Sequence, residues 1–111
     1  MASDPAFVEY VCDQITAAGQ IASRKMFGDY AIYCNGKVVA LICDNQLFVK
    51  PTAGGRVLIG RVVEAPPYPG AKPHFLIDDR LDDREWITGL VCATERETPA
   101  PKPKASRVRK P

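Results

Sequence analysis

The chain lacks the features that would send it into or across a membrane. Its 111 residues contain no apolar run of about 18 residues, which is the length that a membrane-spanning helix needs. Residues 1–5 have neither the basic stretch nor the apolar segment of a secretory signal. These absences predict a cytoplasmic protein with no membrane partner.

The chain also has little of what metal and catalytic sites are made of. It contains one histidine, His74, and four cysteines without a CxxC spacing, whereas a structural zinc site needs four converging ligands. A cysteine–histidine enzyme would need His74 to meet a cysteine, which nothing in the sequence indicates. The pair Gly54-Gly55 lacks the lysine-serine ending of a phosphate-binding loop. We therefore expect no metal, no cofactor, no catalytic residue and no small-molecule substrate.

The four cysteines are expected to be reduced, mostly buried thiols that behave as small hydrophobic residues. They are Cys12, Cys34, Cys43 and Cys92.

Acidic residues are absent from one end of the chain. Residues 98–111 contain five basic residues and no acid, whereas residues 1–97 contain ten basic and thirteen acidic residues, which leaves them at −3. We expect a folded domain over 1–97 and a disordered basic tail over 98–111, because alternating Pro, Ala and Lys cannot pack a core. The tail either binds phosphate groups without sequence preference or only solubilises the protein. Its basic residues are Lys102, Lys104, Arg107, Arg109 and Lys110.

The first element that the sequence does contain is an amphipathic helix. Ser3 or Asp4 can cap it, Pro5 suits its first turn, and Gly19 can end it. Its apolar residues recur at helical spacing on one face. They are Phe7, Val8, Val11, Cys12, Ile15 and Ala18.

A meander of three antiparallel strands follows. Asn35-Gly36 between two apolar runs is a strong hairpin signal, because a type I′ turn needs two residues that tolerate positive φ. It joins a strand near residues 24–34 to one near 37–43, and Asp44-Asn45 joins the latter to a strand over 46–50.

Two-residue turns fix the pairing of these strands. Cys34 then lies opposite Lys37, which places Ile32 opposite Val39 and Tyr30 opposite Leu41. The same pairing holds Cys34 and Cys43 roughly 20 Å apart, too far for a disulfide. The face expected to pack against the helices consists of Ala31, Tyr33, Val38, Ala40, Ile42, Leu47 and Val49.

The opposite face of this sheet is too apolar to be fully wetted, so either a helix covers it or a partner does. A protein partner or a second copy of the chain is the partner expected there. The predicted contact residues are Tyr30, Ile32, Val39, Leu41 and Phe48.

After residue 50 the sequence predicts a short helix over 52–60, a proline-rich loop over 65–70 and a strand over 74–77. The last helix starts after four acids that suit a helix N-terminus, namely Asp78, Asp79, Asp82 and Asp83. Its buried face is predicted to contain Leu81, Trp86, Leu90 and Ala93. The predicted fold class is α+β, an antiparallel sheet flanked by N- and C-terminal helices in two layers.

A nucleic-acid role is the alternative function. Arg24-Lys25 precedes Phe27, Tyr30 and Tyr33, and interleaved charges and rings can form a stacking platform for bases. Core-facing aromatic residues explain the same pattern. In this alternative, Arg24, Lys25 and the basic tail hold DNA nonspecifically.

One stretch of the chain resembles a known family. Residues 24–33 read RKMFGDYAIY, and Asn35-Gly36-Lys37, Ala40-Leu41-Ile42 and Leu47–Lys50 follow. This pattern resembles the N-terminal domain of the TfoX family, bacterial regulators of competence for DNA uptake, which typically show RKMFGGYGIY…GK…AL…LYLK. Gly70–Pro73 and the helix of Trp86 fit later parts of the family, so that the similarity spans about residues 7–93.

The resemblance implies a helix-flanked antiparallel sheet and a non-enzymatic regulatory or adaptor role through protein contact, in transcriptional or competence regulation. The chain departs from the family pattern at Asp29, where the family has a second glycine. It also has the basic tail where longer TfoX proteins have a C-terminal helical domain.

Overall fold

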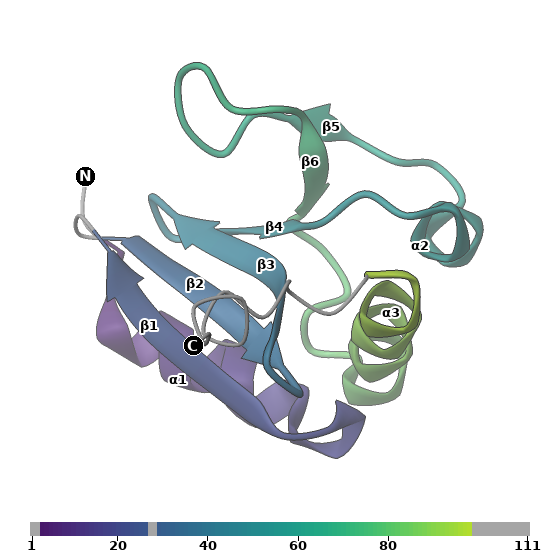
Figure 1. Ribbon diagram of the computed structural model, residues 1–111, viewed down its shortest axis with the longest axis horizontal. Coiled ribbons are helices and arrows are strands. Elements are labelled where there is room, and N and C mark those ends of the chain that lie inside the picture. The colour runs from purple at the N-terminus through teal and green to yellow at the C-terminus, as the bar shows by residue number, and fades with distance from the viewer. Residues whose placement is uncertain (1–2, 27–28, 99–111) are drawn as a thin grey trace, which may run out of the picture.

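The computed structural model describes residues 3–26 and 29–98, and in them three helices lie on one side of a six-stranded sheet (Figure 1). The strand order is β1-β2-β3-β4-β6-β5, and every neighbouring pair is antiparallel. The predicted α+β class is thus confirmed. The strands are β1 (Ile21–Met26), β2 (Asp29–Cys34), β3 (Lys37–Cys43), β4 (Gln46–Val49), β5 (Glu64–Ala65) and β6 (His74–Ile77). The helices are α1 (Pro5–Gln14), α2 (Ala53–Ile59) and α3 (Arg84–Glu97).

Helix α1 begins as the sequence predicts but ends earlier. The Asp4 side chain accepts a hydrogen bond from the Ala6 amide, 2.9 Å away, and Pro5 is the first helical residue. The α-helix stops at Gln14, and a 3₁₀ turn over Thr16–Ala18 leads to Gly19, so the expected end at Gly19 is wrong for the α-helix. The apolar face is confirmed, because Val8, Val11 and Ile15 are buried and Phe7, Cys12 and Ala18 pack beside them.

The strand predicted near residues 24–34 is in fact two strands. β1 runs from Ile21 to Met26 and pairs with β2, with Met26 opposite Asp29. The sequence hides this reversal because Phe27-Gly28 is not one of the residue pairs that mark a two-residue hairpin. The strand that the sequence did not predict is β1, and it forms one edge of the sheet.

The two predicted hairpins are confirmed. Asn35 and Gly36 have φ of 55° and 83°, and Asp44 and Asn45 have φ of 54° and 59°. Positive φ at both central residues is what a type I′ turn requires. Each turn therefore joins its strands through two residues, as the sequence indicates.

The pairing between β2 and β3 differs from the predicted one because β3 contains a bulge. Cys34 pairs with Lys37 and Tyr33 with Val38, but Ile32 pairs with Ala40. Val39 is therefore an extra residue that shifts the register by one. The predicted pairs of Ile32 with Val39 and of Tyr30 with Leu41 are wrong, whereas the predicted pairing of Leu41 with Phe48 is confirmed.

This bulge changes which residues of β2 face the helices. The predicted core face is confirmed for Ala40, Ile42, Leu47 and Val49, all of which belong to the hydrophobic core. The predicted core face is wrong for β2 and the start of β3, where the residues expected in the core lie on the other face of the sheet. The core instead takes Ile32, Cys34 and Val39, whereas Ala31, Tyr33 and Val38 lie on the opposite face.

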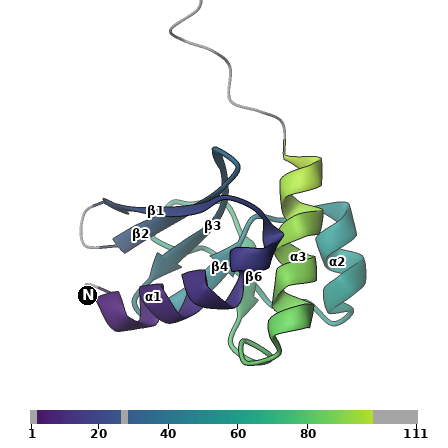
Figure 2. The same cartoon turned by 90° about the horizontal axis from the view of Figure 1, so that it is seen from below.

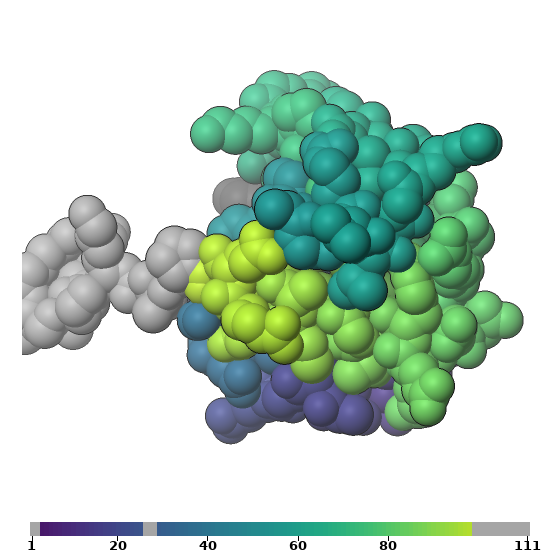
Figure 3. Space-filling model, turned by 90° about the vertical axis from the view of Figure 1, so that its right-hand side faces the viewer, coloured from purple at the N-terminus to yellow at the C-terminus, as the bar shows by residue number. Residues whose placement is uncertain are grey.

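Helix α3 closes the core and holds α2 beside it (Figure 3). Asp83 caps α3 by accepting from the Trp86 amide at 3.1 Å, as expected for the acids before it. Leu90 and Ala93 are buried as predicted, and Leu81 and Trp86 are half-buried against the core. The Trp86 indole donates to the Leu58 carbonyl of α2 at 3.4 Å, so the ring joins the two helices.

The described part of the chain ends shortly after α3. α3 stops at Glu97, and residues 99–111, with the five basic residues of the predicted tail, lie outside the described residues. Within residues 3–26 and 29–98, no helix is both long and apolar enough to cross a bilayer.

Replacement by alanine is expected to have opposite effects on stability at two glycines. Gly36 has a φ of 83°, a region that costs a residue with Cβ about 1 kcal/mol, so Gly36→Ala should destabilise the fold by about that much. Gly89 lies inside α3 with open space around it, and Gly89→Ala should stabilise by about 0.5–1 kcal/mol. Urea unfolding of the two variants measures both signs, and equal effects would contradict the assigned turn.

The start of α2 depends on a carboxylate from α3. Glu97 accepts from the Ala53 and Gly54 amides at 3.1 and 2.7 Å, which satisfies two donors that a helix leaves free at its start. We expect Glu97→Ala to lower the free energy of unfolding by about 1 kcal/mol, a typical loss for a helix cap. Glu97→Gln is the control, because it keeps an acceptor oxygen and should lose less than half of that. An alanine variant as stable as the native chain in urea would show that the contact does not stabilise α2.

Candidate functional site

One face of the sheet has no described helix over it, and we call it the helix-free face. It is turned toward the viewer in Figure 1 and upward in Figure 2, with α1 on the opposite side. Phe48 and Ala31 are buried within this face at 4% and 1% exposure. Tyr33, Val38, Leu41 and Leu76 are only half-buried, so apolar surface remains open to solvent there.

The structure divides the five predicted contact residues between the two faces. Leu41 and Phe48 pair across β3 and β4 on the helix-free face. Ile32 and Val39 have no exposed surface and belong to the core, and Tyr30 packs partly against it. The single surface expected from these five residues is therefore not assembled, because the Val39 bulge turns one part of the set toward the helices.

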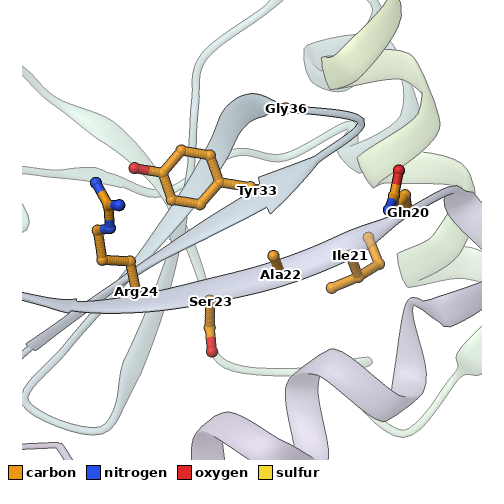
Figure 4. A pocket seen from close by; sticks show the side chains of 7 residues that line it. All are labelled: Gln20, Ile21, Ala22, Ser23, Arg24, Tyr33 and Gly36. Atoms are coloured by element: carbon orange, nitrogen blue, oxygen red, sulfur yellow. The ribbon is translucent and has the colours of Figure 1, made fainter.

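A groove of about 560 Å³ runs beside the helix-free face along β1. Five successive residues, 20–24, line it together with Tyr33 and Gly36. Arg24 and Tyr33 project to the same side of the strands, whereas Ser23 points the other way (Figure 4). Because Ala22 and Gly36 have little or no side chain, the Tyr33 ring and the Arg24 side chain stand above a shallow floor.

Sequence reasoning misses this groove because it assigns no strand to residues 20–23. The run Ile21-Ala22-Ser23-Arg24 shows no clean alternation of apolar and polar residues. The signal that could have revealed β1 is Gly28, since a glycine within a strand-like run often marks a reversal or a bulge.

The basic residues of the nucleic-acid hypothesis are only partly described. Arg24 and Lys25 are exposed side chains of β1. The ion pairs within residues 3–26 and 29–98 join Lys37 to Glu95, Arg56 to Glu64 and Arg84 to Asp13, and so involve neither of them. Phe27 and the basic residues of the tail lie outside the described residues.

His74 lies in a separate recess of about 260 Å³, where the end of β4, the start of β6 and the end of α3 meet. Its Nδ1 is 2.9 Å from the Lys72 carbonyl oxygen, and since a carbonyl only accepts, Nδ1 carries the hydrogen. The recess also contains Lys50, Lys72 and the Glu97 carboxylate, which is already bonded to α2. No cysteine lines this recess, so the structure does not bring His74 to a thiol there.

All four cysteines are free thiols, and burial lowers the reactivity of three of them. Burial, together with the nearby carboxylates of Asp29 and Asp44, raises the pKa of Cys43 to about 11. Burial also raises the pKa of Cys12 and of Cys34. A raised pKa leaves little thiolate at neutral pH, and the thiolate is the reactive form. Cys34 and Cys92 both donate to the Ala18 carbonyl, at 3.7 and 3.8 Å, which makes them part of the packing between β2 and α3.

The acids before α3 have a local role. Asp83 caps the helix, and Asp78, Asp79 and Asp82 are exposed beside it. Within residues 3–26 and 29–98, no group of three or more histidine, cysteine or acidic side chains is placed to hold a metal ion.

The similarity of this chain to known proteins covers almost the whole of this fold. The model of the TfoX N-terminal domain matches residues 13–97, which run from the end of α1 to the end of α3. A Spirochaeta aurantia protein named "Uncharacterized 12.7 kDa protein in trpE 5'region" is 35% identical over 111 residues, which cover 100% of this chain and 96% of the relative. A match from α1 through α3, and a relative similar along nearly its full length, show that this chain belongs to the TfoX N-terminal domain family.

Proposed function

We propose that this protein is a non-enzymatic regulatory or adaptor domain that acts through protein contact, and that the helix-free face is its contact surface. The observation that supports this is the apolar surface left open by Tyr33, Val38, Leu41 and Leu76 on a sheet whose other face is closed by helices. Membership in a family of regulatory type agrees with such a role.

The size of the face favours a transient complex. Its six strands, spaced about 4.8 Å apart, span about 24 Å. They have two to seven residues and are roughly 7–23 Å long, so the area of the face is on the order of 400 Å². A standard stable interface buries about 800 Å² on each partner. The face alone therefore suits a reversible regulatory contact rather than a permanent assembly.

The chemistry of the polar groups agrees with a non-enzymatic role. The pKa of Cys43 lies far above neutral pH because the thiol is buried beside Asp29 and Asp44, and such a thiol is a poor nucleophile. His74 donates its Nδ1 hydrogen to a backbone carbonyl rather than to a reactive partner. Both residues are therefore proposed to have structural roles.

Leu41→Glu tests the helix-free face, because it places a charge at the centre of the proposed contact. Val57→Glu is the matched control, since Val57 on α2 is 80% exposed and lies outside the face. We expect both variants to fold, and Leu41→Glu to reduce partner capture or self-association about tenfold or more, the effect of losing about 1.4 kcal/mol. Sedimentation velocity of the pure protein and quantitative affinity enrichment from the native cell measure this. If Leu41→Glu matched Val57→Glu in both measurements, the helix-free face would not be the contact surface.

A further inference from the structure

The edge strand β1 has features of a peptide-binding site. It stands at one end of the sheet and has six residues, about 20 Å of strand, whereas β5 at the other end has only two. A long edge strand offers unpaired backbone groups to which another extended segment can add. Within the described residues, β1 is the longer of the two edges.

The hydrogen-bond pattern shows which backbone groups are available. The Asn35 amide donates to the Gln20 carbonyl at 2.8 Å, which fixes Gln20 and Asn35 as a hydrogen-bonded pair. Antiparallel pairs alternate, so Ala22 and Arg24 also turn their backbone groups toward β2. The amides and carbonyls of Ile21, Ser23 and Lys25 then point away from the sheet. Within residues 3–26 and 29–98, no side chain or loop bonds to these outward groups.

The groove follows the same strand. Because its lining includes each of the five successive residues 20–24, the hollow follows the first four residues of β1 rather than lying over one side chain. Ala22 forms a low floor, and the Tyr33 ring supplies an apolar wall (Figure 4). Its volume is about 560 Å³, and its shallow, open shape suits an extended segment laid along the strand.

The charge of β1 decides which occupant fits. The strand contains Arg24 and Lys25 and no acid, and both side chains are exposed. The chain's own segment 98–111 has five basic residues and no acid, so it would be repelled. A second β1 is disfavoured too, because registers centred near Arg24 and Lys25 place like charges opposite each other, and basic residues on an edge discourage self-pairing. An acidic segment of another protein has the complementary charge.

We propose that β1 binds an extended acidic segment of a partner protein, which adds to the sheet as a further strand. The backbone of the segment bonds to the outward groups of Ile21, Ser23 and Lys25. Arg24 and Lys25 are consecutive, so their side chains lie on opposite faces of the sheet, and the two matching acids are adjacent in the partner's sequence. This inference rests on the proposed role in protein contact but uses the edge of the sheet instead of the helix-free face.

Amide hydrogen exchange, followed by NMR on the full chain, tests the geometry directly. The probe is the capped peptide Val-Thr-Asp-Glu-Val-Thr, titrated to several millimolar, and the control peptide has Lys-Lys in place of Asp-Glu. At saturation we expect exchange of the Ile21, Ser23 and Lys25 amides to slow about tenfold or more, because bonded amides are protected. The Ala22 and Arg24 amides already face β2 and should change less than about twofold. The lysine peptide should protect none of them.

Variants separate the charge from the backbone contribution. The double variant Arg24→Gln with Lys25→Gln should lower the affinity for the acidic peptide about three- to tenfold, as expected for the loss of two exposed charge pairs. Arg61→Gln with Lys72→Gln removes the same charge from exposed positions away from β1 and should leave the affinity unchanged. Ser23→Pro removes an outward amide and should abolish protection. If Ser23→Pro fails to fold, the two double glutamine variants still test the role of charge. All four of their substituted side chains are exposed, so both variants should fold.

Three results would overturn the proposal. In the first, the acidic peptide slows the exchange of none of the outward amides. In the second, a single-stranded oligonucleotide slows their exchange and the peptide does not. In the third, their exchange slows when only the protein concentration is raised. The last would indicate pairing between two copies. Leu76→Glu changes the helix-free face four strands away from β1 and should bind the peptide as the native chain does. The result for this variant therefore separates a wrong assignment of the helix-free face from a wrong assignment of the edge strand.

Discussion

The placement of one residue, Val39, decides the character of both faces of this sheet. Val39 is inserted into β3 opposite β2, so the pairing shifts by one residue between Tyr33 and Ile32. Side chains on a strand alternate between the two faces of the sheet. A shift of one residue in the pairing therefore changes the face on which the residues beyond it lie, relative to their partners on the other strand. The bulge thus brings Ile32 and Val39 into the core, while Tyr33 and Val38 stay on the helix-free face. Without it, the helices would meet a different set of side chains.

A second constraint fixes the hairpin after β2 to the rest of the fold. The Asn35 side chain accepts from the Gln20 amide at 2.9 Å, and Gly19 leaves room for it, since a Cβ at Gly19 would lie 2.8 Å from that side chain. Lys37, beside the turn, donates to Glu95 of α3, with 3.1 Å between Nζ and the carboxylate. This hydrogen bond is the main reason that the pKa of Glu95 is lowered. The turn, the start of β1 and the end of α3 are therefore held together where the groove begins.

Core packing and the two proposed contact surfaces lie on different parts of the sheet. All three helices pack on one face and bury the core there. Among the described residues, no helix covers the opposite face and no strand pairs with the outer edge of β1. The helix-free face offers apolar side chains around Leu41, and the edge offers backbone groups beside Arg24 and Lys25. Apolar area and directional hydrogen bonds contribute different kinds of specificity, and adjacent surfaces of both kinds suit a small domain that acts by contact.

The sequence by itself determined the α+β class, helix α1 with a cap at Ser3 or Asp4, and both two-residue hairpins, because these depend on local capping and turn chemistry. It also determined that Leu47 and Val49 enter the core and that Leu41 pairs with Phe48. Only the tertiary structure decided the reversal between Met26 and Asp29, the bulge at Val39 and hence the face to which Ile32 belongs. These depend on how strands pair across the sheet and how the helices pack on it, and no local spacing of residues encodes such long-range fits.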